Sequence, residues 1–390
     1  SWADEKARLL VMANADTPAD AKRALKFGAM GIGLCRTERM FNDPARLPIV
    51  IDMIIADTKE EREKALDKLL PIQREDFKNI FSIMAPRPVT IRLLDPPIHE
   101  FLPQEQQLID EIDILRNLRK NLRGLRVLSD TVSFMYQNDP AHPKVLTPAD
   151  PELLDAVILK KEMMLSKVRS LHEVNPMLGH RGVRLGLTFP EIYSMQIRAI
   201  LEAAAECRKE GIDVHPEIMI PQVCTAQELN RVKEWVAEIH KQVEDAYGLK
   251  ISCSFGSMLE VVRACMRAEN LAEEAEFFSF GTNDLTQATF SFSREDAENK
   301  FLPMYNMNHI LQDNPFEVLD VKGVGKLMEL AVQWGRTTRP GMKVGICGEH
   351  GGHPASIEFC HQIGLTYVSC SSPRVPIARL AAAHAAIKSR

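Results

Sequence analysis

The chain has 390 residues, of which 45% are hydrophobic and 26% charged, and its formal net charge at pH 7 is −5. These values are ordinary for a soluble globular protein with a full core, and the acidic balance argues against nucleic acid as a partner. Since no stretch approaches 18 consecutive apolar residues, we also expect no membrane-spanning segment.

The eight cysteines are scattered and form no Cys-x-x-Cys pair, a usage typical of reduced thiols in an intracellular protein. The first residues, Ser1 to Asp4, form no signal peptide and include no initiator methionine, so we expect a fragment of a longer protein. The cytoplasm is the expected compartment, and an organelle such as a chloroplast or a glycosome is the alternative.

Eight short apolar runs recur along the chain, and each ends in polar or charged residues. They cover residues 9–13, 31–35, 89–94, 217–221, 251–260, 277–284, 343–349 and 366–371. Their length and continuity are typical of buried parallel strands. Helical patterns such as 18–27, 191–209 and 226–247 lie between most of them. Eight strand–helix alternations predict an α/β protein with a closed (β/α)₈ TIM barrel.

Two connections are too long for simple barrel loops, with about 50 residues after the second strand and about 120 after the third. The longer one contains helical patterns at 105–126 and 151–172. Four prolines indicate an exposed linker between these patterns: Pro140, Pro143, Pro148 and Pro151. We predict helical excursions after strands 2 and 3, and one barrel domain over 1–390 with a helical insertion at roughly 96–176.

Chemically useful side chains gather at the predicted strand ends, which carry the active site in barrels of this class. They are Arg36, Arg92, Glu260, Asn283, Asp284, Cys347 and Glu349. Each has an ordinary structural explanation by itself, as an ion-pair partner, a helix cap or a buried thiol. Together, arginines on early strands and carboxylates on later ones suit a phosphate group bridged to Mg²⁺.

At these positions the sequence resembles the family of phosphoenolpyruvate (PEP)-utilising enzymes. The matching segments are 31–38 (GIGLCRTE), 90–95 (TIRLLD), 179–182 (GHRG), 256–260 (GSMLE), 277–287 (FFSFGTNDLTQ) and 345–349 (GICGE). Segments 95–103 (DPPIHEFLP), 348–352 (GEHGG) and 374–380 (RVPIARL) resemble the dikinase branch of the family. The synthase branch and the first enzyme of sugar phosphotransfer systems remain alternatives.

The resemblance implies a reversible, Mg²⁺-dependent phosphoryl transfer between PEP or pyruvate and a phosphohistidine. By resemblance, Arg36, Arg92 and Arg181 hold the phosphoryl group. Glu260 and Asp284 would bind the Mg²⁺ cofactor and, through it, the substrate.

The resemblance also assigns the rest of the substrate site. Gly281, Thr282 and Asn283 would line the pyruvate carboxylate. Cys347 would be the acid and base at the methylene carbon of the enolate, since a thiol can exchange a proton there.

Two parts of the full reaction are absent from the sequence. We find no Gly-rich ATP loop and no Thr-Cys-His segment, so ATP-binding and phosphohistidine domains are expected amino-terminal to Ser1 in the same polypeptide. A nucleophile at His180 or His350 is the alternative. The resemblance further implies a homodimer. A non-catalytic PEP sensor is a second alternative, and the complete set of side chains argues against it.

Overall fold

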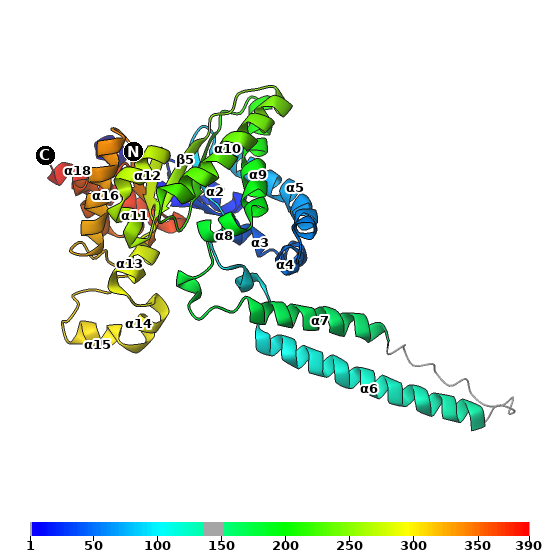
Figure 1. Cartoon of the computed structure of the whole chain (residues 1–390). Coiled ribbons are helices and arrows are strands. Elements are labelled where there is room, and N and C mark those ends of the chain that lie inside the picture. Colours follow the sequence, from blue (N-terminus) through cyan, green and yellow to red (C-terminus); the bar gives the residue numbers. More distant parts are fainter. Residues whose placement is uncertain (1, 136–151, 390) are drawn as a thin grey trace. The chain divides into compact units, whose positions relative to one another are not determined.

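A computed structural model of the chain describes residues 2–135 and 152–389. Its centre is a closed barrel of eight parallel strands, each paired with the next in chain order and β8 with β1. Figure 1 shows the whole chain, with the helices that cover the barrel. The strands are β1 Leu10–Asn14, β2 Ile32–Arg36, β3 Pro88–Arg92, β4 His215–Ile220, β5 Ser254–Leu259, β6 Phe277–Phe280, β7 Lys343–Ile346 and β8 Tyr367–Ser371. The predicted (β/α)₈ TIM barrel is confirmed.

The strands are apolar on both faces because both faces are covered. All four residues of β6 are buried, and β2 and β4 are buried except at one end. One cluster joins opposite sides of the barrel and therefore fills its interior: Leu34, Met219, Met258, Phe277 and Cys347. Gly345 on β7 has no room for a side chain, since a Cβ there would lie 2.2 Å from the Tyr367 ring.

The predicted strand ends are too late in five places, at 94, 221, 260, 284 and 349. The largest difference is at β6, which ends at Phe280, while helix α13 (Thr282–Phe290) begins two residues later. Asn283 and Asp284 therefore lie in the first turn of a helix and not on a strand. The run of polar residues after Gly281 favours a helix start, but the preceding apolar run carries no signal of where the strand stops.

Helices surround the barrel and begin close to the predicted positions. Thr225 and Glu228 form a capping box that starts α10 (Ala226–Tyr247) at the predicted residue. The remaining outer helices include α1 Trp2–Lys6, α2 Pro18–Lys26, α9 Pro190–Lys209, α11 Val262–Met266, α12 Ala268–Glu274, α16 Val324–Thr338, α17 Pro354–Gln362 and α18 Val375–Lys388. None of the helices within 2–135 and 152–389 combines the length and the apolar character needed to span a bilayer.

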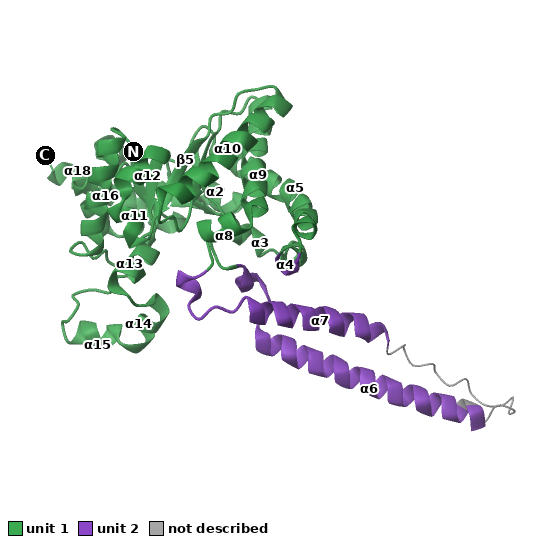
Figure 2. Cartoon of the chain, in the orientation of Figure 1, with its two compact units in different colours: residues 1–53, 58–97, 180–390 green, residues 54–57, 98–179 purple. Residues whose placement is uncertain are grey.

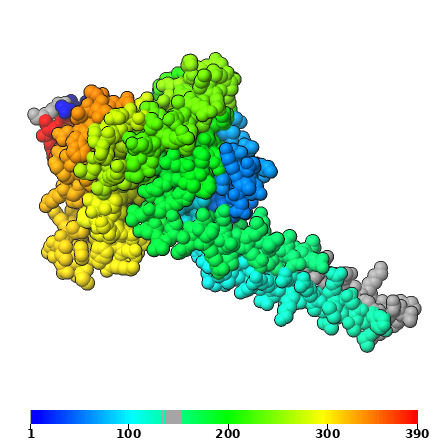
Figure 3. Space-filling view, viewed as in Figure 1, coloured from blue at the N-terminus to red at the C-terminus, as the bar shows by residue number. Residues whose placement is uncertain are grey.

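Helical excursions follow strands 2 and 3, as predicted. The first holds α3 Thr37–Phe41, α4 Leu47–Ile55 and α5 Lys59–Met84, and the second holds η1 Ile98–Phe101, α6 Glu105–Met135, α7 Leu153–Ser170, η2 Pro176–Leu178 and α8 Val183–Thr188. A third excursion follows β6 and contains α13, α14 (Arg294–Lys300) and α15 (Leu302–Met307). We did not predict it, although 58 residues lie between the predicted runs 277–284 and 343–349. Figure 3 shows its yellow lobe, whose own small core contains Ala297, Leu302 and Phe316.

The chain divides into two compact units (Figure 2). The barrel unit contains residues 1–53, 58–97 and 180–390, and the second unit contains 54–57 and 98–179. In the second unit α6 and α7 run antiparallel, and ion pairs such as Lys161–Glu111 (2.5 Å) and Arg169–Glu105 (2.8 Å) join them. The proline-rich linker and the predicted helix start at Pro151 lie outside the described residues. The single domain with an insertion at roughly 96–176 stays a prediction.

Candidate active site

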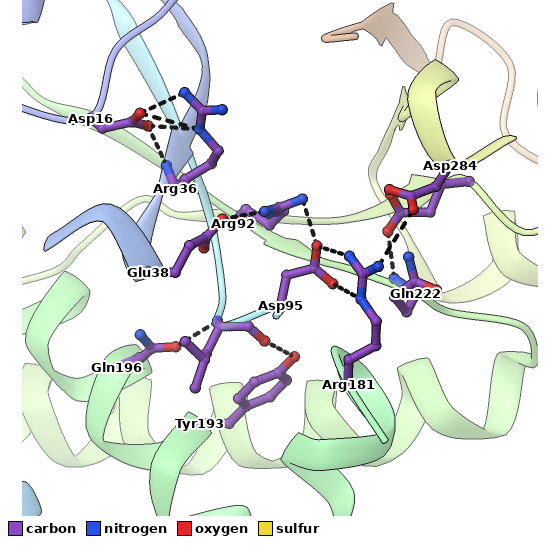
Figure 4. A network of polar contacts seen from close by, with 12 residues as sticks. Asp16, Arg36, Glu38, Arg92, Asp95, Arg181, Tyr193, Gln196, Gln222 and Asp284 are labelled. Carbon is purple, nitrogen blue, oxygen red and sulfur yellow. Dashed lines mark hydrogen bonds and ion pairs between the residues drawn. The ribbon is translucent and has the colours of Figure 1, made fainter. Parts of the chain in front are cut away.

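Two arginines lie next to each other at the carboxyl ends of neighbouring strands. Arg36 ends β2, Arg92 ends β3, and the two are register partners. Asp16 orients Arg36, because its Oδ2 accepts from Nη2 at 2.7 Å and its Oδ1 accepts from the Arg36 backbone N–H at 2.8 Å (Figure 4). About a third of the Arg36 side chain stays exposed, so an anion can still reach its guanidinium group.

Arg92 is more deeply buried and is held by two carboxylates. Its Nη2 contacts Glu38, and its Nη1 lies 2.8 Å from Asp95 Oδ2. Burial opposes the charge of this guanidinium group, but Asp95 and Glu38 outweigh it and raise the pKa of Arg92 well above its ordinary value. Arg92 therefore remains a cation, and its geometry is set before any ligand binds.

Arg181 reaches the same place from the loop before α8, not from a strand. Its Nη2 donates to Asp95 Oδ2 at 2.6 Å, and its Nη1 lies 3.5 Å from Asp284 Oδ1. Figure 4 shows Arg181 between these two carboxylates. The next residue, Gly182, has φ 58° and its N–H donates to the Asp95 carbonyl at 2.9 Å, which turns the loop towards the barrel. Arg92, Arg181 and Asp284 thus belong to one network.

Glu260 and Asp284 form a pair of close carboxylates. Glu260 follows β5 and is 2% exposed; its Oε1 accepts from the Gln222 N–H at 2.7 Å, whereas its Oε2 is buried without a partner. Burial and repulsion by Asp284 and Asp95 raise the pKa of Glu260 well above its ordinary value. Burial also raises the pKa of Asp284, although Arg181 opposes the shift. A bound cation would offset the repulsion between these two carboxylates.

Helix α13 directs its amino end into this region. Gly281 is its N-cap residue, and a Cβ there would lie 2.6 Å from Glu260 Oε2, so only glycine leaves room for that carboxylate. Thr282 is fully buried, and the side-chain Oδ1 of Asn283 is buried without a hydrogen-bond partner. The amino end of a helix offers free N–H groups and positive potential, both of which favour a carboxylate ligand.

Cys347 follows β7 and is 3% exposed. Its Sγ lies 3.7 Å from the Phe280 carbonyl oxygen, and its own carbonyl accepts from Asn14 Nδ2 at 3.0 Å. Burial raises the pKa of the Cys347 thiol to about 11. The thiol is therefore protonated at neutral pH, which suits the donation of a proton.

Together, these groups provide cationic, anionic and proton-donating side chains at one end of one barrel. Within 2–135 and 152–389, no group of three or more His, Cys, Asp or Glu side chains is arranged to hold a metal. Glu260 and Asp284 nevertheless suit Mg²⁺, which commonly binds one or two carboxylates and takes its other ligands from substrate and water.

Sequence reasoning missed four residues of the network. Asp95 directly follows the predicted third strand, and Glu38 lies two residues after Arg36, so position alone could have indicated both. Asp16 and Gln222 also follow strands, yet nothing in the sequence shows that Gln222 has φ 58°, a left-handed conformation rare for a side chain of this kind. That turn aims its N–H at Glu260. Strained backbone of this kind is concentrated at functional sites.

Comparison with known proteins adds to this geometry. The family model described as "PEP-utilising enzyme, PEP-binding domain" matches residues 1–387. The match therefore covers almost the whole chain, including every residue of the network.

Three relatives, all named pyruvate, phosphate dikinase, are similar over the same range. The protein of Entamoeba histolytica is 53% identical over 99% of this chain and 40% of its own length. That of Clostridium symbiosum is 47% identical over 100% of this chain and 40% of its own length, and the chloroplastic protein of Arabidopsis thaliana is 50% identical over 99% and 36%. The chain thus spans about two fifths of the length of these relatives.

Proposed function

The chain belongs to the family of PEP-utilising enzymes, as a PEP-binding domain, and on this premise we propose that it carries the PEP- and pyruvate-binding step of an enzyme with pyruvate, phosphate dikinase activity. The step is a reversible transfer of a phosphoryl group to the enolate of pyruvate. One observation carries the proposal: Arg92, Arg181 and Asp284 form a single network around Asp95, beside Glu260, whose Oε2 has no partner.

The arginines would hold the phosphoryl group. Phosphoryl transfer needs positioned groups that neutralise oxygen charge, and guanidinium groups do this with paired N–H donors. Arg92 and Arg181 are fixed by Asp95, and Arg36 is fixed by Asp16 while partly exposed. This arrangement supports binding in which little side-chain freedom is lost.

Glu260 and Asp284 would hold Mg²⁺. The raised pKa values of both carboxylates and the unpartnered Glu260 Oε2 support a cation between them. When bound, Mg²⁺ would stabilise negative charge on the enolate and the carboxylate of the substrate. The backbone at Gly281 and Thr282 and the amide of Asn283 would bind the substrate carboxylate.

Cys347 would donate a proton to the methylene carbon of the enolate and remove one from the methyl group of pyruvate. Its protonated thiol supports the first role directly. The reverse direction needs the thiolate, so it should accelerate as the pH rises.

The phosphoryl donor would be a phosphohistidine outside the chain. Both histidines considered as internal nucleophiles have bonded ring nitrogens: His180 Nε2 lies 3.0 Å from Thr188 Oγ1, and His350 is fully buried with both nitrogens bonded. The relatives' greater length supports a donor and an ATP-binding domain elsewhere in the same polypeptide. We further propose that the protein is a homodimer. We also propose a reducing intracellular compartment, with the cytoplasm as the first choice, because the eight cysteines are free thiols.

A direct test follows solvent deuterium into the methyl group of pyruvate in the presence of Mg²⁺. The wild-type chain should catalyse the exchange, and Cys347→Ala should abolish it while still binding PEP in calorimetry. Exchange unaffected by Cys347→Ala would refute the role of the thiol. A chain that binds PEP without any exchange, with or without Cys347, would favour a sensor. Phosphate dependence of the intact protein would separate a dikinase from a synthase.

A further inference from the structure

His350 is a buried histidine for which the proposed reaction has no use. It lies in the short helix η3 (Glu349–Gly352), three residues after Cys347, and is fully buried. Both of its ring nitrogens are bonded: Nδ1 lies 2.7 Å from Thr282 Oγ1 and Nε2 lies 2.9 Å from the Pro315 carbonyl oxygen. The imidazole therefore joins the first turn of α13 to the lobe that follows β6.

The two partners fix the position of the ring proton. A backbone carbonyl oxygen can only accept, so Nε2 must carry the hydrogen that it donates to Pro315. Burial lowers the pKa of His350 to about 4, so the ring is neutral at neutral pH and Nδ1 has only a lone pair. The Thr282 hydroxyl must then be the donor in the bond to Nδ1.

This direction determines what Thr282 can offer a ligand. Its only hydroxyl proton is directed at His350, so the hydroxyl cannot donate to a substrate carboxylate. The contact is close because Gly348 has no side chain: a Cβ there would lie 2.1 Å from Thr282 Oγ1. A carboxylate at α13 must therefore be bound by backbone N–H groups and by Asn283.

We propose that His350 is a positioning residue that locks the Thr282 hydroxyl by accepting its proton at Nδ1, and so holds the first turn of α13 in the geometry that binds the substrate carboxylate. The inference rests on the proposed function for the identity of that substrate. The bond to Thr282, and not the bond to Pro315, is the one that sustains binding.

Two substitutions separate the two bonds. In His350→Asn the side-chain oxygen takes the place of Nδ1 and can accept from Thr282, but nothing reaches Pro315. In His350→Gln the side-chain NH₂ takes the place of Nε2 and can donate to Pro315, but the acceptor for Thr282 is lost. Calorimetry with PEP, and separately with pyruvate, both with Mg²⁺, measures the effect.

The dissociation constants of His350→Asn for both ligands should lie within about threefold of wild type. Those of His350→Gln should rise by at least about tenfold, since a lost hydrogen bond near a charged group weakens binding by roughly that factor. The affinities for PEP and for pyruvate should fall equally because both ligands carry the carboxylate. Thr282→Val should match His350→Gln, and the double variant should be no weaker than either. Equal affinities in all variants, or a loss confined to His350→Asn, would overturn the inference.

A second measurement uses the wild-type chain without any ligand, so it needs neither a folded variant nor binding. In ¹⁵N spectra of the wild-type chain at pH 7, His350 should be the Nε2–H tautomer with an unprotonated Nδ1. The opposite tautomer would overturn the inference even if PEP binds. Failure of the wild type to bind PEP with Mg²⁺ would instead count against the proposed function, while this tautomer would still be expected.

Discussion

Asp95 and Arg181 form a nearly buried ion pair, with Nη2 and Oδ2 2.6 Å apart and side chains that are 7% and 2% exposed for the arginine and the aspartate. The same Oδ2 lies 2.8 Å from Arg92 Nη1. One carboxylate therefore sets the positions of two guanidinium groups, one at the end of strand β3 and one in the loop before α8. Removing its charge would leave two buried cations short of a partner.

Asp95→Asn should therefore cost both stability and affinity. Breaking a buried pair by removing one partner typically costs about 3–5 kcal/mol, and the effect on unfolding in urea should be of that order. PEP affinity should fall as well, because Arg92 and Arg181 lose their common anchor. Glu358→Gln, which breaks an exposed pair with Lys388, is the matched control and should change little. A stable variant with normal affinity would contradict the anchoring role.

A second, partly buried pair should affect stability without affecting the site. Lys343, the first residue of β7, donates from Nζ to Glu217 on β4 at 2.6 and 2.8 Å, and Thr90 on β3 donates to the same carboxylate at 2.6 Å. Lys343 lies at the amino end of its strand, away from the catalytic groups. Lys343→Met should destabilise by about 2 kcal/mol, between the values for exposed and buried pairs, and adding Glu217→Gln should restore part of the loss.

Two measurements test this pair: the free energy of unfolding in urea and the affinity for PEP. The single variant should lose stability while its affinity for PEP stays close to that of wild type. A comparable loss of affinity at temperatures where the variant is folded would mean that the amino end of the barrel influences the site.

The sequence was sufficient to predict the barrel because each strand is a short buried run, and burial on both faces leaves a strong pattern. It was insufficient where one residue decides the geometry. The strand β6 stops at Phe280 because Gly281 caps α13, and a continuous run of residues hides that change. The lobe after β6 could have been predicted from length alone, because 58 residues lie between the predicted runs 277–284 and 343–349.

The convergence of the strand-end residues could be predicted, because barrel topology fixes their positions. Arg181 has no such position; only the resemblance indicated it, and the loop turned by Gly182 brings it to Asp95. Gln222 could not be predicted, because its contribution to Glu260 is a backbone N–H aimed by a positive φ. Backbone conformation of this kind depends on packing contacts far apart in the chain.

Proton exchange at pyruvate should depend strongly on pH. Burial raises the pKa of Cys347 to about 11, so only a small fraction of thiolate exists at pH 7. That fraction grows about tenfold per pH unit below the pKa. The rate of methyl deuteration with Mg²⁺ should therefore climb between pH 7 and pH 9, and Cys347→Ser should remove the rise. A profile that levels off near pH 8 would contradict the raised pKa.

Glu260→Gln should stabilise the folded chain when Mg²⁺ is absent and make it less stable than wild type when Mg²⁺ is present. Burial and nearby carboxylates raise the pKa of Glu260, so its charged form opposes folding at neutral pH, and the neutral variant should be more stable than wild type without metal. Mg²⁺ at about 100 times its dissociation constant should stabilise wild type by about 2.7 kcal/mol and the variant far less. Equal stabilisation of both by Mg²⁺ would place the ion elsewhere.

Acid should destabilise the chain in part through His350. Its pKa is lowered to about 4 by burial in the folded state, whereas an unfolded histidine titrates near 6.5. The unfolded chain therefore takes up a proton first, and stability that is fully present above pH 6.5 is lost as the pH falls towards 4. At pH 5 this residue alone should cost about 2 kcal/mol. His350→Asn, which has no such proton to bind, should lose that much less than wild type between pH 7 and pH 5 in urea unfolding. Parallel losses in the two proteins would mean that the folded imidazole takes up a proton as readily as an unfolded one, and the lowered pKa of His350 would then be wrong.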